Sequence, residues 1–113
     1  MERLNDALLD ELRDLMEDAF PSLLQTYLRD SELQFMAARD ALASGDLESL
    51  GRCAHSLKGA SSNIGAVQLA EYCCELERSA RQARRERLPL ALELVSDELR
   101  EVRAAVEALY RAC

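Results

Sequence analysis

The sequence is poor both in residues that favour β-sheets and in residues that break helices. Its 113 residues include four valines, one isoleucine and one threonine, and tryptophan is absent. Only two prolines and four glycines interrupt a chain rich in Leu, Ala, Glu and Arg, which are good helix formers. These shortages predict an all-α protein, and the length leaves room for one compact domain, residues 1–113.

Other absences narrow the possible functions. No apolar run approaches the roughly 20 residues that span a bilayer, and the first ten residues are acidic rather than signal-like. Asp and Glu number 21 against 14 Lys and Arg, and the resulting net charge of −7 repels nucleic-acid phosphates and anionic lipids. We therefore expect a cytoplasmic protein that binds neither nucleic acid nor membrane.

The cysteines and the single histidine predict no metal centre. The four cysteines form no Cys-x-x-Cys pair, and one histidine cannot complete a Cys/His set with them. A carboxylate-bridged metal bundle needs Glu-x-x-His pairs, but Arg52 occupies the position three residues before His55. We expect buried or half-buried reduced thiols at positions 53, 73, 74 and 113.

Prolines, glycines and capping residues predict where the helices begin and end. A short first helix is expected at about 5–18, capped by Asn5 or Asp6. Pro21 suits the first turn of a helix over 21–44, which Gly45 would end in the left-handed conformation. The remaining helices are expected at 46–63, with an Asp46 cap and Gly65 as terminator, at 66–86, and at 89–112 behind Pro89.

Each long helix carries a stripe of apolar or small residues at helical spacing. Four such stripes joined by short loops predict an antiparallel four-helix bundle, with the short first helix packed across one end. A coiled-coil dimer through the last helix is the alternative, but an intramolecular core accounts for all four stripes, and we expect a monomer. The stripes are Leu24, Leu28, Ser31, Phe35, Ala38 and Leu42; Leu47, Leu50, Ala54, Leu57, Ser61 and Ile64; Leu69, Cys73, Leu76, Ala80 and Ala83; and Leu88, Leu92, Val95, Leu99, Val102, Val106 and Leu109.

The charge is distributed unevenly along the chain. Residues 1–50 hold twelve acids and four bases, a net charge of −8, whereas residues 51–113 hold nine acids and ten bases, a net charge of +1. Five arginines lie between positions 78 and 87. This cluster is compatible with a solvated helix end and with a surface that meets an acidic partner.

The predicted third helix carries the candidate chemistry. Gly51 and Gly59 lie four residues before and after His55, although each glycine inside a helix costs about 1 kcal/mol relative to alanine. Lys58, the only lysine, lies three residues after His55, and Ser62 shares the same face. An imidazole is nucleophilic near neutral pH, and an ammonium group offsets the charge of a bound phosphoryl group. A surface histidine between packing glycines is the structural alternative.

These residues belong to a longer recognisable string. Residues 53–66, Cys-Ala-His-Ser-Leu-Lys-Gly-Ala-Ser-Ser-Asn-Ile-Gly-Ala, closely resemble the signature of histidine-containing phosphotransfer (HPt) domains, which are four-helix bundles of bacterial and fungal phosphorelays. The resemblance continues through Leu69, Cys73, Leu76 and Glu77, and the helix layout fits from about residue 4 to 113. It implies that His55 accepts a phosphoryl group from the aspartyl phosphate of one receiver domain and passes it to an aspartate of another.

The resemblance also implies roles for the neighbours of His55. Lys58 would steady the phosphoryl oxygens, and Gly59 would keep the imidazole accessible. Family members often place a polar residue of the next helix, frequently glutamine, near the histidine, and the matching position here is Glu77. Because an acid repels a phosphoryl group, we do not expect Glu77 to contact that group, and Arg81 one turn further is the expected substitute.

The implied protein is a phosphocarrier without a nucleotide site, and the sequence contains neither a P-loop nor a G-x-G-x-x-G motif. The implied partners are receiver domains of hybrid sensor histidine kinases and of response regulators, which would supply the Mg²⁺. Length alone suggests a free-standing protein, with an excised domain as the alternative. The competing function is a helical adaptor that docks on receiver or kinase domains without carrying phosphate.

The first helix has more leucines than a short helix needs for anchoring. We expect Leu9 and Leu15 to pack against the end of the bundle. Leu8 and Leu12 are expected to form part of an apolar patch on which the receiver docks.

Overall fold

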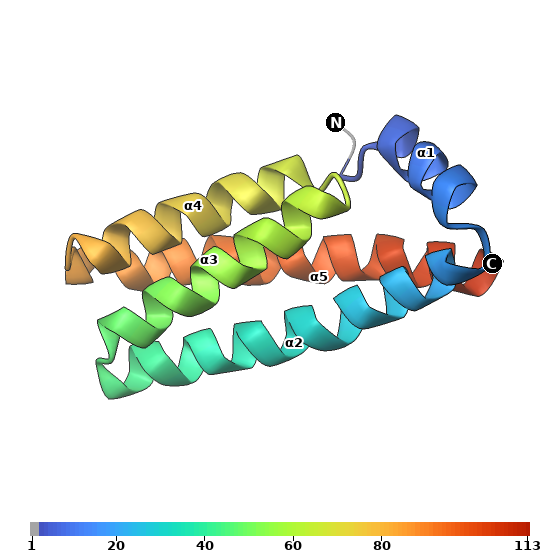
Figure 1. The fold of residues 1–113 in the computed structure, drawn as a ribbon. Helices are drawn as coiled ribbons and strands as arrows, with labels where there is room; N and C mark the ends of the chain where they lie inside the picture. The colour runs from blue at the N-terminus through green and yellow to red at the C-terminus, as the bar shows by residue number, and fades with distance from the viewer. Residues whose placement is uncertain (1–2) are drawn as a thin grey trace.

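The computed structural model describes residues 3–113, and these residues form helices joined by short turns, without a β-strand (Figure 1). The long helices α2, α3, α4 and α5 run antiparallel to their neighbours in a four-helix bundle, and α1 lies across one end. The predicted fold class is therefore confirmed. The helices are α1 (Asp6–Met16), α2 (Phe20–Ser44), α3 (Leu47–Asn63), α4 (Val67–Arg81) and α5 (Leu88–Ala112), with short 3₁₀ turns at Glu17–Ala19 and Arg85–Arg87. Within the described residues, every helix is too short or too polar to serve as a bilayer-spanning segment.

Local capping signals set most of the helix boundaries. The side chain of Asn5 accepts a hydrogen bond from the backbone N–H of Leu8 at 3.0 Å, and Asp46 does the same for Ser49 at 3.1 Å. Gly45 ends α2 with a φ of +76°, in the left-handed region that favours glycine. The two prolines lie in the first turns of α2 and α5, where their missing N–H groups leave no bond unmade.

Two helices end earlier than the sequence predicts. The first stops at Met16 instead of about residue 18, because Glu17 adopts a φ of +48° and starts a 3₁₀ turn. The fourth stops at Arg81 instead of about residue 86. There Ala83 adopts a φ of +53°, and the N–H of the next residue bonds the carbonyl of Ser79 at 2.9 Å. This is a Schellman-type cap that usually carries glycine at its left-handed position, so the sequence gives no warning of it.

The core is built from the predicted stripes, with few exceptions. Residues of all four long helices are buried, and a hydroxyl pair links α2 to α3, with Tyr27 Oη and Ser61 Oγ 3.0 Å apart. Ala83, which the pattern placed in the core, is exposed because it lies beyond the end of α4. The buried hydrophobic residues of α2–α5 include Leu24, Ala38, Leu50, Ala54, Leu57, Leu69, Cys73, Leu76, Ala80, Leu88, Leu92, Val95, Leu99, Val102 and Val106.

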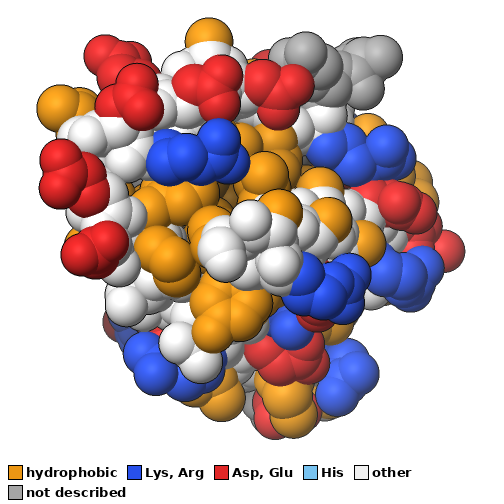
Figure 2. All heavy atoms as spheres, turned by 90° about the vertical axis from the view of Figure 1, so that its right-hand side faces the viewer, with side chains coloured by type: hydrophobic (Ala, Val, Ile, Leu, Met, Phe, Trp, Pro, Cys, Tyr) orange, Lys and Arg blue, Asp and Glu red, His pale blue; other side chains and the backbone are white. Residues whose placement is uncertain are grey.

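The α1 helix presents a single narrow face to the bundle. Leu9 is buried as predicted, but Leu15 is 75% exposed, so the prediction that Leu15 packs against the bundle is wrong. Six residues at 100° each place Leu15 about 120° around the helix from Leu9, away from the face that Leu12 and Met16 share with it. Figure 2 shows this end of the molecule, with acidic side chains gathered along one edge and apolar side chains between them.

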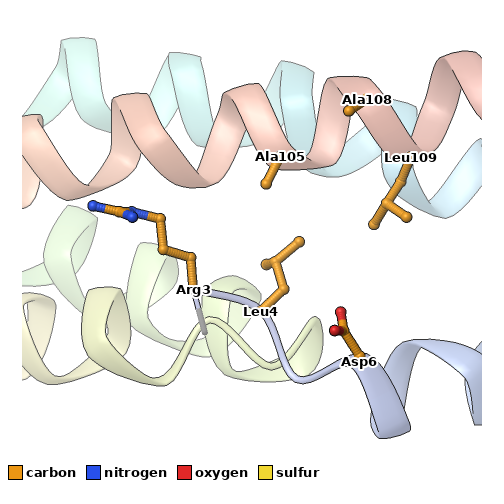
Figure 3. A pocket seen from close by; sticks show the side chains of 6 residues that line it. All are labelled: Arg3, Leu4, Asp6, Ala105, Ala108 and Leu109. Atoms are coloured by element: carbon orange, nitrogen blue, oxygen red, sulfur yellow. The ribbon is translucent and has the colours of Figure 1, made fainter. Parts of the chain in front are cut away.

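A shallow cavity of about 420 Å³ separates the N-terminal segment from α5. Leu4 and Asp6 line it from one side, and Ala105, Ala108 and Leu109 line it from α5, as Figure 3 shows. None of its lining residues comes from α3 or α4. The cavity therefore lies apart from the helix that carries His55.

The left-handed alanine after α4 makes a stability prediction. Ala83→Gly should raise the free energy of unfolding by about 0.5–1 kcal/mol, because an L-residue in this region pays roughly 1–2 kcal/mol, which outweighs the extra unfolded-state entropy of glycine. Urea denaturation measures the change. The matched control is Ala104→Gly, at an exposed position inside α5, which should lower stability by about 1 kcal/mol. If both variants were destabilised, the left-handed conformation assigned to Ala83 in the cap would be wrong.

The buried phenol of Tyr27 makes a pH prediction. Burial raises the pKa of Tyr27 to about 12, although the hydrogen bond to Ser61 by itself lowers this pKa. Between about pH 10 and pH 12 the unfolded chain releases the phenol proton while the folded protein keeps it. The free energy of unfolding is therefore unaffected by the titration of this group below about pH 10 and decreases as the pH rises toward about 12. Over that range the native protein should lose up to about 1.4 kcal/mol per pH unit more than Tyr27→Phe. Denaturant titrations of both proteins at several alkaline pH values check this, and parallel curves would contradict it.

Candidate functional site

His55 lies in the middle of α3, one residue after the buried Ala54. Its side chain is 62% exposed, and its Nδ1 atom lies 3.0 Å from Oε2 of Glu77 on α4. Among the described residues no side chain or backbone group bonds its other nitrogen, Nε2. The imidazole is therefore fixed at one nitrogen and open to solvent at the other.

Glu77 is the centre of a network between α3 and α4. Its side chain is only 11% exposed, and its carboxylate contacts nitrogen atoms of three side chains. Oε1 accepts from Nζ of Lys58 at 2.9 Å, while Oε2 accepts from Nε of Arg81 at 3.0 Å and faces His55. Burial by itself raises the pKa of Glu77, but the hydrogen bonds from Lys58 and Arg81 outweigh it and hold the pKa below its usual value. The carboxylate is thus ionised at neutral pH.

An ionised carboxylate fixes the tautomer of the neutral imidazole. Such a group only accepts hydrogen bonds, so the Nδ1 atom of His55 must carry the proton that it shares with Glu77. The lone pair of the neutral ring then lies on Nε2, the exposed nitrogen. This arrangement presents a nucleophile to an incoming group.

Lys58 and Arg81 surround the carboxylate with positive charge. The hydrogen bond to Glu77 raises the pKa of Lys58, so its ammonium group is charged at neutral pH. Both side chains are partly exposed, at 32% for Lys58 and 60% for Arg81. An ammonium group has three N–H donors, and the bond to Glu77 engages one of them. The site therefore offers further donors to an anionic group.

The two glycines that flank His55 serve different purposes. At Gly59 a Cβ atom would meet nothing within 4 Å, so no packing within the described chain requires glycine there. At Gly51, which is buried, a Cβ atom would lie 3.7 Å from the Arg81 side chain and 3.9 Å from Ala80. The space above Gly51 is therefore bordered by α4. Only Gly59 leaves the helix surface bare.

The remaining predicted residues lie outside the network. Ser62 is exposed near the end of α3. Leu8 and Leu12 are half-buried on α1, and Leu12 packs against the core. Because α1 contacts α2 and the Glu17–Ala19 turn rather than α3, the structure does not bring these leucines beside His55. Their docking role stays a prediction.

The sequence reading missed the bond between His55 and Glu77. The family resemblance placed Glu77 near the histidine, and the only contact considered for the acid was one with a phosphoryl group. In the structure the acid faces Nδ1, on the far side of the ring from Nε2. Arg81, the expected substitute, bonds the carboxylate instead. The available signal was the position of Glu77 directly after core residue Leu76 and four residues before Arg81, which places a carboxylate at the edge of the core beside a cation.

Among residues 3–113, the cysteines and acidic side chains form no second centre. All four cysteines are free, but Cys113 is exposed at the end of α5, so the prediction of a buried or half-buried thiol is wrong there. Burial raises the pKa of Cys73 to about 12, which keeps its thiol protonated. Within residues 3–113 no group of His, Cys, Asp and Glu side chains is arranged to hold a metal ion.

Comparisons with known proteins find chains of similar structure. The histidine-containing phosphotransfer protein HptB from Pseudomonas aeruginosa PAO1 is 41% identical, with a TM-score of 0.94 over 98% of this chain and 96% of that chain. A phosphotransfer protein from maize, ZmHP2, is 21% identical, and a putative one from rice is 15% identical, each with a TM-score of 0.84 over 96% of this chain. The matches cover 84% of the maize chain and 80% of the rice chain, and at these identities they show the fold alone.

A search of curated proteins finds no match. The profile of the Hpt domain matches residues 22–111, which include α3, α4 and the whole network around Glu77. The similarity to HptB extends over nearly the full length of both chains. The chain therefore belongs to the Hpt family of histidine phosphotransfer domains.

Proposed function

We propose that this chain is a phosphocarrier whose His55 takes a phosphoryl group from the aspartyl phosphate of one receiver domain and gives it to an aspartate of another. Family membership supports a histidine phosphotransfer role in a phosphorelay. The observation that carries the assignment to His55 is its geometry, with Nδ1 bonded to a buried carboxylate and Nε2 open to solvent.

The transfer needs little equipment from the carrier. Nε2 attacks phosphorus, the N–P bond forms, and the P–O bond to the receiver aspartate breaks with its electron pair returning to the carboxylate. The second transfer reverses these events toward another aspartate. Lys58 is placed to offset the charge of the phosphoryl oxygens, because its ammonium group lies one turn along α3 from His55.

The proposed partners follow from this chemistry. Receiver domains of hybrid sensor histidine kinases would supply the phosphoryl group, and receiver domains of response regulators would accept it. We propose that Mg²⁺ comes with the receiver and that the chain brings no cofactor and no nucleotide site. We further propose that it works as a monomer in the cytoplasm, since a single imidazole on one bundle suffices for the carrier step.

The first test assigns the phosphorylated residue. The native chain and His55→Gln are incubated with a phosphorylated receiver domain and Mg²⁺, and the phosphate on each chain is followed. The native chain should acquire a label that is acid-labile and base-stable, while His55→Gln should acquire none, because an amide nitrogen is no nucleophile.

Other outcomes contradict this assignment. A label on both chains would place the phosphoryl group on another residue. Measurable docking of several receivers without any transfer would favour the adaptor that binds but carries no phosphate.

The bare surface at Gly59 makes the second prediction. Gly59→Ala should raise the free energy of unfolding by about 0.5–1 kcal/mol, because alanine is the better helix former and its Cβ atom meets open space. Gly59→Leu should slow transfer from a phosphorylated receiver by about tenfold or more, because its side chain occupies space that the partner needs.

The matched control is Ala104→Leu, which places the same side chain at an exposed helical position on α5. It should leave transfer unchanged. Equal transfer rates for Gly59→Leu and the native chain would show that the partner does not approach over Gly59.

A further inference from the structure

We propose that the carboxylate of Glu77 is the counter-charge that keeps a proton on Nδ1 of His55 while the phosphoryl group is on Nε2. Both transfers then proceed without gain or loss of a proton by the ring. This inference rests on the proposed function and assigns Glu77 an electrostatic role in addition to orienting the imidazole.

The charge of the ring changes during the cycle. The form of the His55 imidazole that attacks is the neutral one, which beside the carboxylate has its proton on Nδ1 and its lone pair on Nε2. Attack on phosphorus uses that lone pair, so the product ring carries the N–P bond, the Nδ1 proton and a formal positive charge. When the phosphoryl group leaves, the electron pair of the N–P bond returns to Nε2 and the ring is neutral again. No proton has moved, provided that Nδ1 keeps its own.

The surroundings of the ring make this counter-charge necessary. Lys58 on α3 and Arg81 on α4 are both cations, and both lie within hydrogen-bond distance of the same carboxylate as His55. Without Glu77 these two cations would face the positive ring without compensation and would favour loss of its proton. The thiol of Cys74 is the other titratable group near Lys58. No hydrogen bond joins a charged group of α2 or α5 to the network in the described residues.

The burial of Glu77 indicates that its negative charge, and not only its ability to accept a hydrogen bond, contributes to its role. A carboxylate that is 11% exposed loses most of its hydration, and this cost is offset only by its three donors. A neutral amide at the same position would also accept a hydrogen bond from Nδ1, without that cost. Deprotonation of the phosphorylated ring would leave an imidazole anion as the leaving group, which departs less readily than a neutral imidazole.

The test compares Glu77→Gln with the native chain. Glu75→Gln is the matched control, because Glu75 lies on the same helix and pairs with Arg78 outside the network. Each protein is phosphorylated chemically with phosphoramidate, so that the measurement does not depend on a receiver. Nitrogen-15 NMR then reports whether Nδ1 of the phosphorylated ring is protonated between about pH 6 and pH 9.

We expect the native chain and Glu75→Gln to keep the Nδ1 proton over this range and Glu77→Gln to lose it. In a second measurement, the rate of transfer from phosphorylated His55 to a receiver should fall about tenfold or more between about pH 6.5 and pH 8.5 for Glu77→Gln, with little change for the native chain. Glu77→Asp, which restores the charge, should move the profile back toward the native one.

A native-like proton and a native-like pH profile in Glu77→Gln would overturn the proposal. So would a loss of rate that is equal at every pH, because that result describes a residue which only orients the ring. If phosphoramidate labels His55 but no receiver exchanges phosphate with it, the proposed function fails, while the NMR comparison still decides the role of Glu77.

Discussion

The polar contacts between α3 and α4 centre on one enclosed carboxylate. Glu77 is nearly buried, so its negative charge requires the donors that surround it, and two of these, His55 and Lys58, come from the other helix. His55 and Lys58 lie one turn apart on α3 and share one acceptor group on α4. This shared contact limits how far one helix can slide past the other. A displacement of either helix would leave a charge without its partner.

The sequence was sufficient to predict the bundle because its helix signals are local. Asn5, Gly45 and Asp46 act on neighbouring residues, and each does in the structure what its chemistry favours. The end of α4 was not predictable in this way. Its cap requires Ala83 in a conformation that alanine seldom adopts, and nothing in the surrounding run of helix formers signals that change. The burial of Leu9 and the exposure of Leu15 depend on the angle at which α1 meets the bundle, which no local pattern encodes.

In the candidate site too, some features follow from local sequence and others depend on how the helices pack. His55, Lys58 and Gly59 lie within five residues of one another on one helix, so helical spacing alone identifies them as neighbours. Glu77 lies 22 residues from His55, and its position against Nδ1 depends on the register of two packed helices. The different environments of Gly51 and Gly59 also depend on that packing. Sequence analysis therefore identified the nucleophile and, through the family resemblance, the position of Glu77 near it, but it did not predict the bond to Nδ1.

The open position of His55 on a helix face has a consequence for how long a signal lasts. Its ring is 62% exposed, and Gly59 leaves the adjoining surface bare, so this chain forms only one wall of any reaction chamber. Under the proposed function each receiver covers the exposed side of His55 when it binds. Water is excluded while the receiver is bound and returns when it dissociates. Between encounters a stored phosphoryl group is in contact with solvent. The lifetime of the phosphorylated state then depends on two competing rates, transfer at the next encounter with a receiver and hydrolysis. The concentration of receivers determines which of the two is faster.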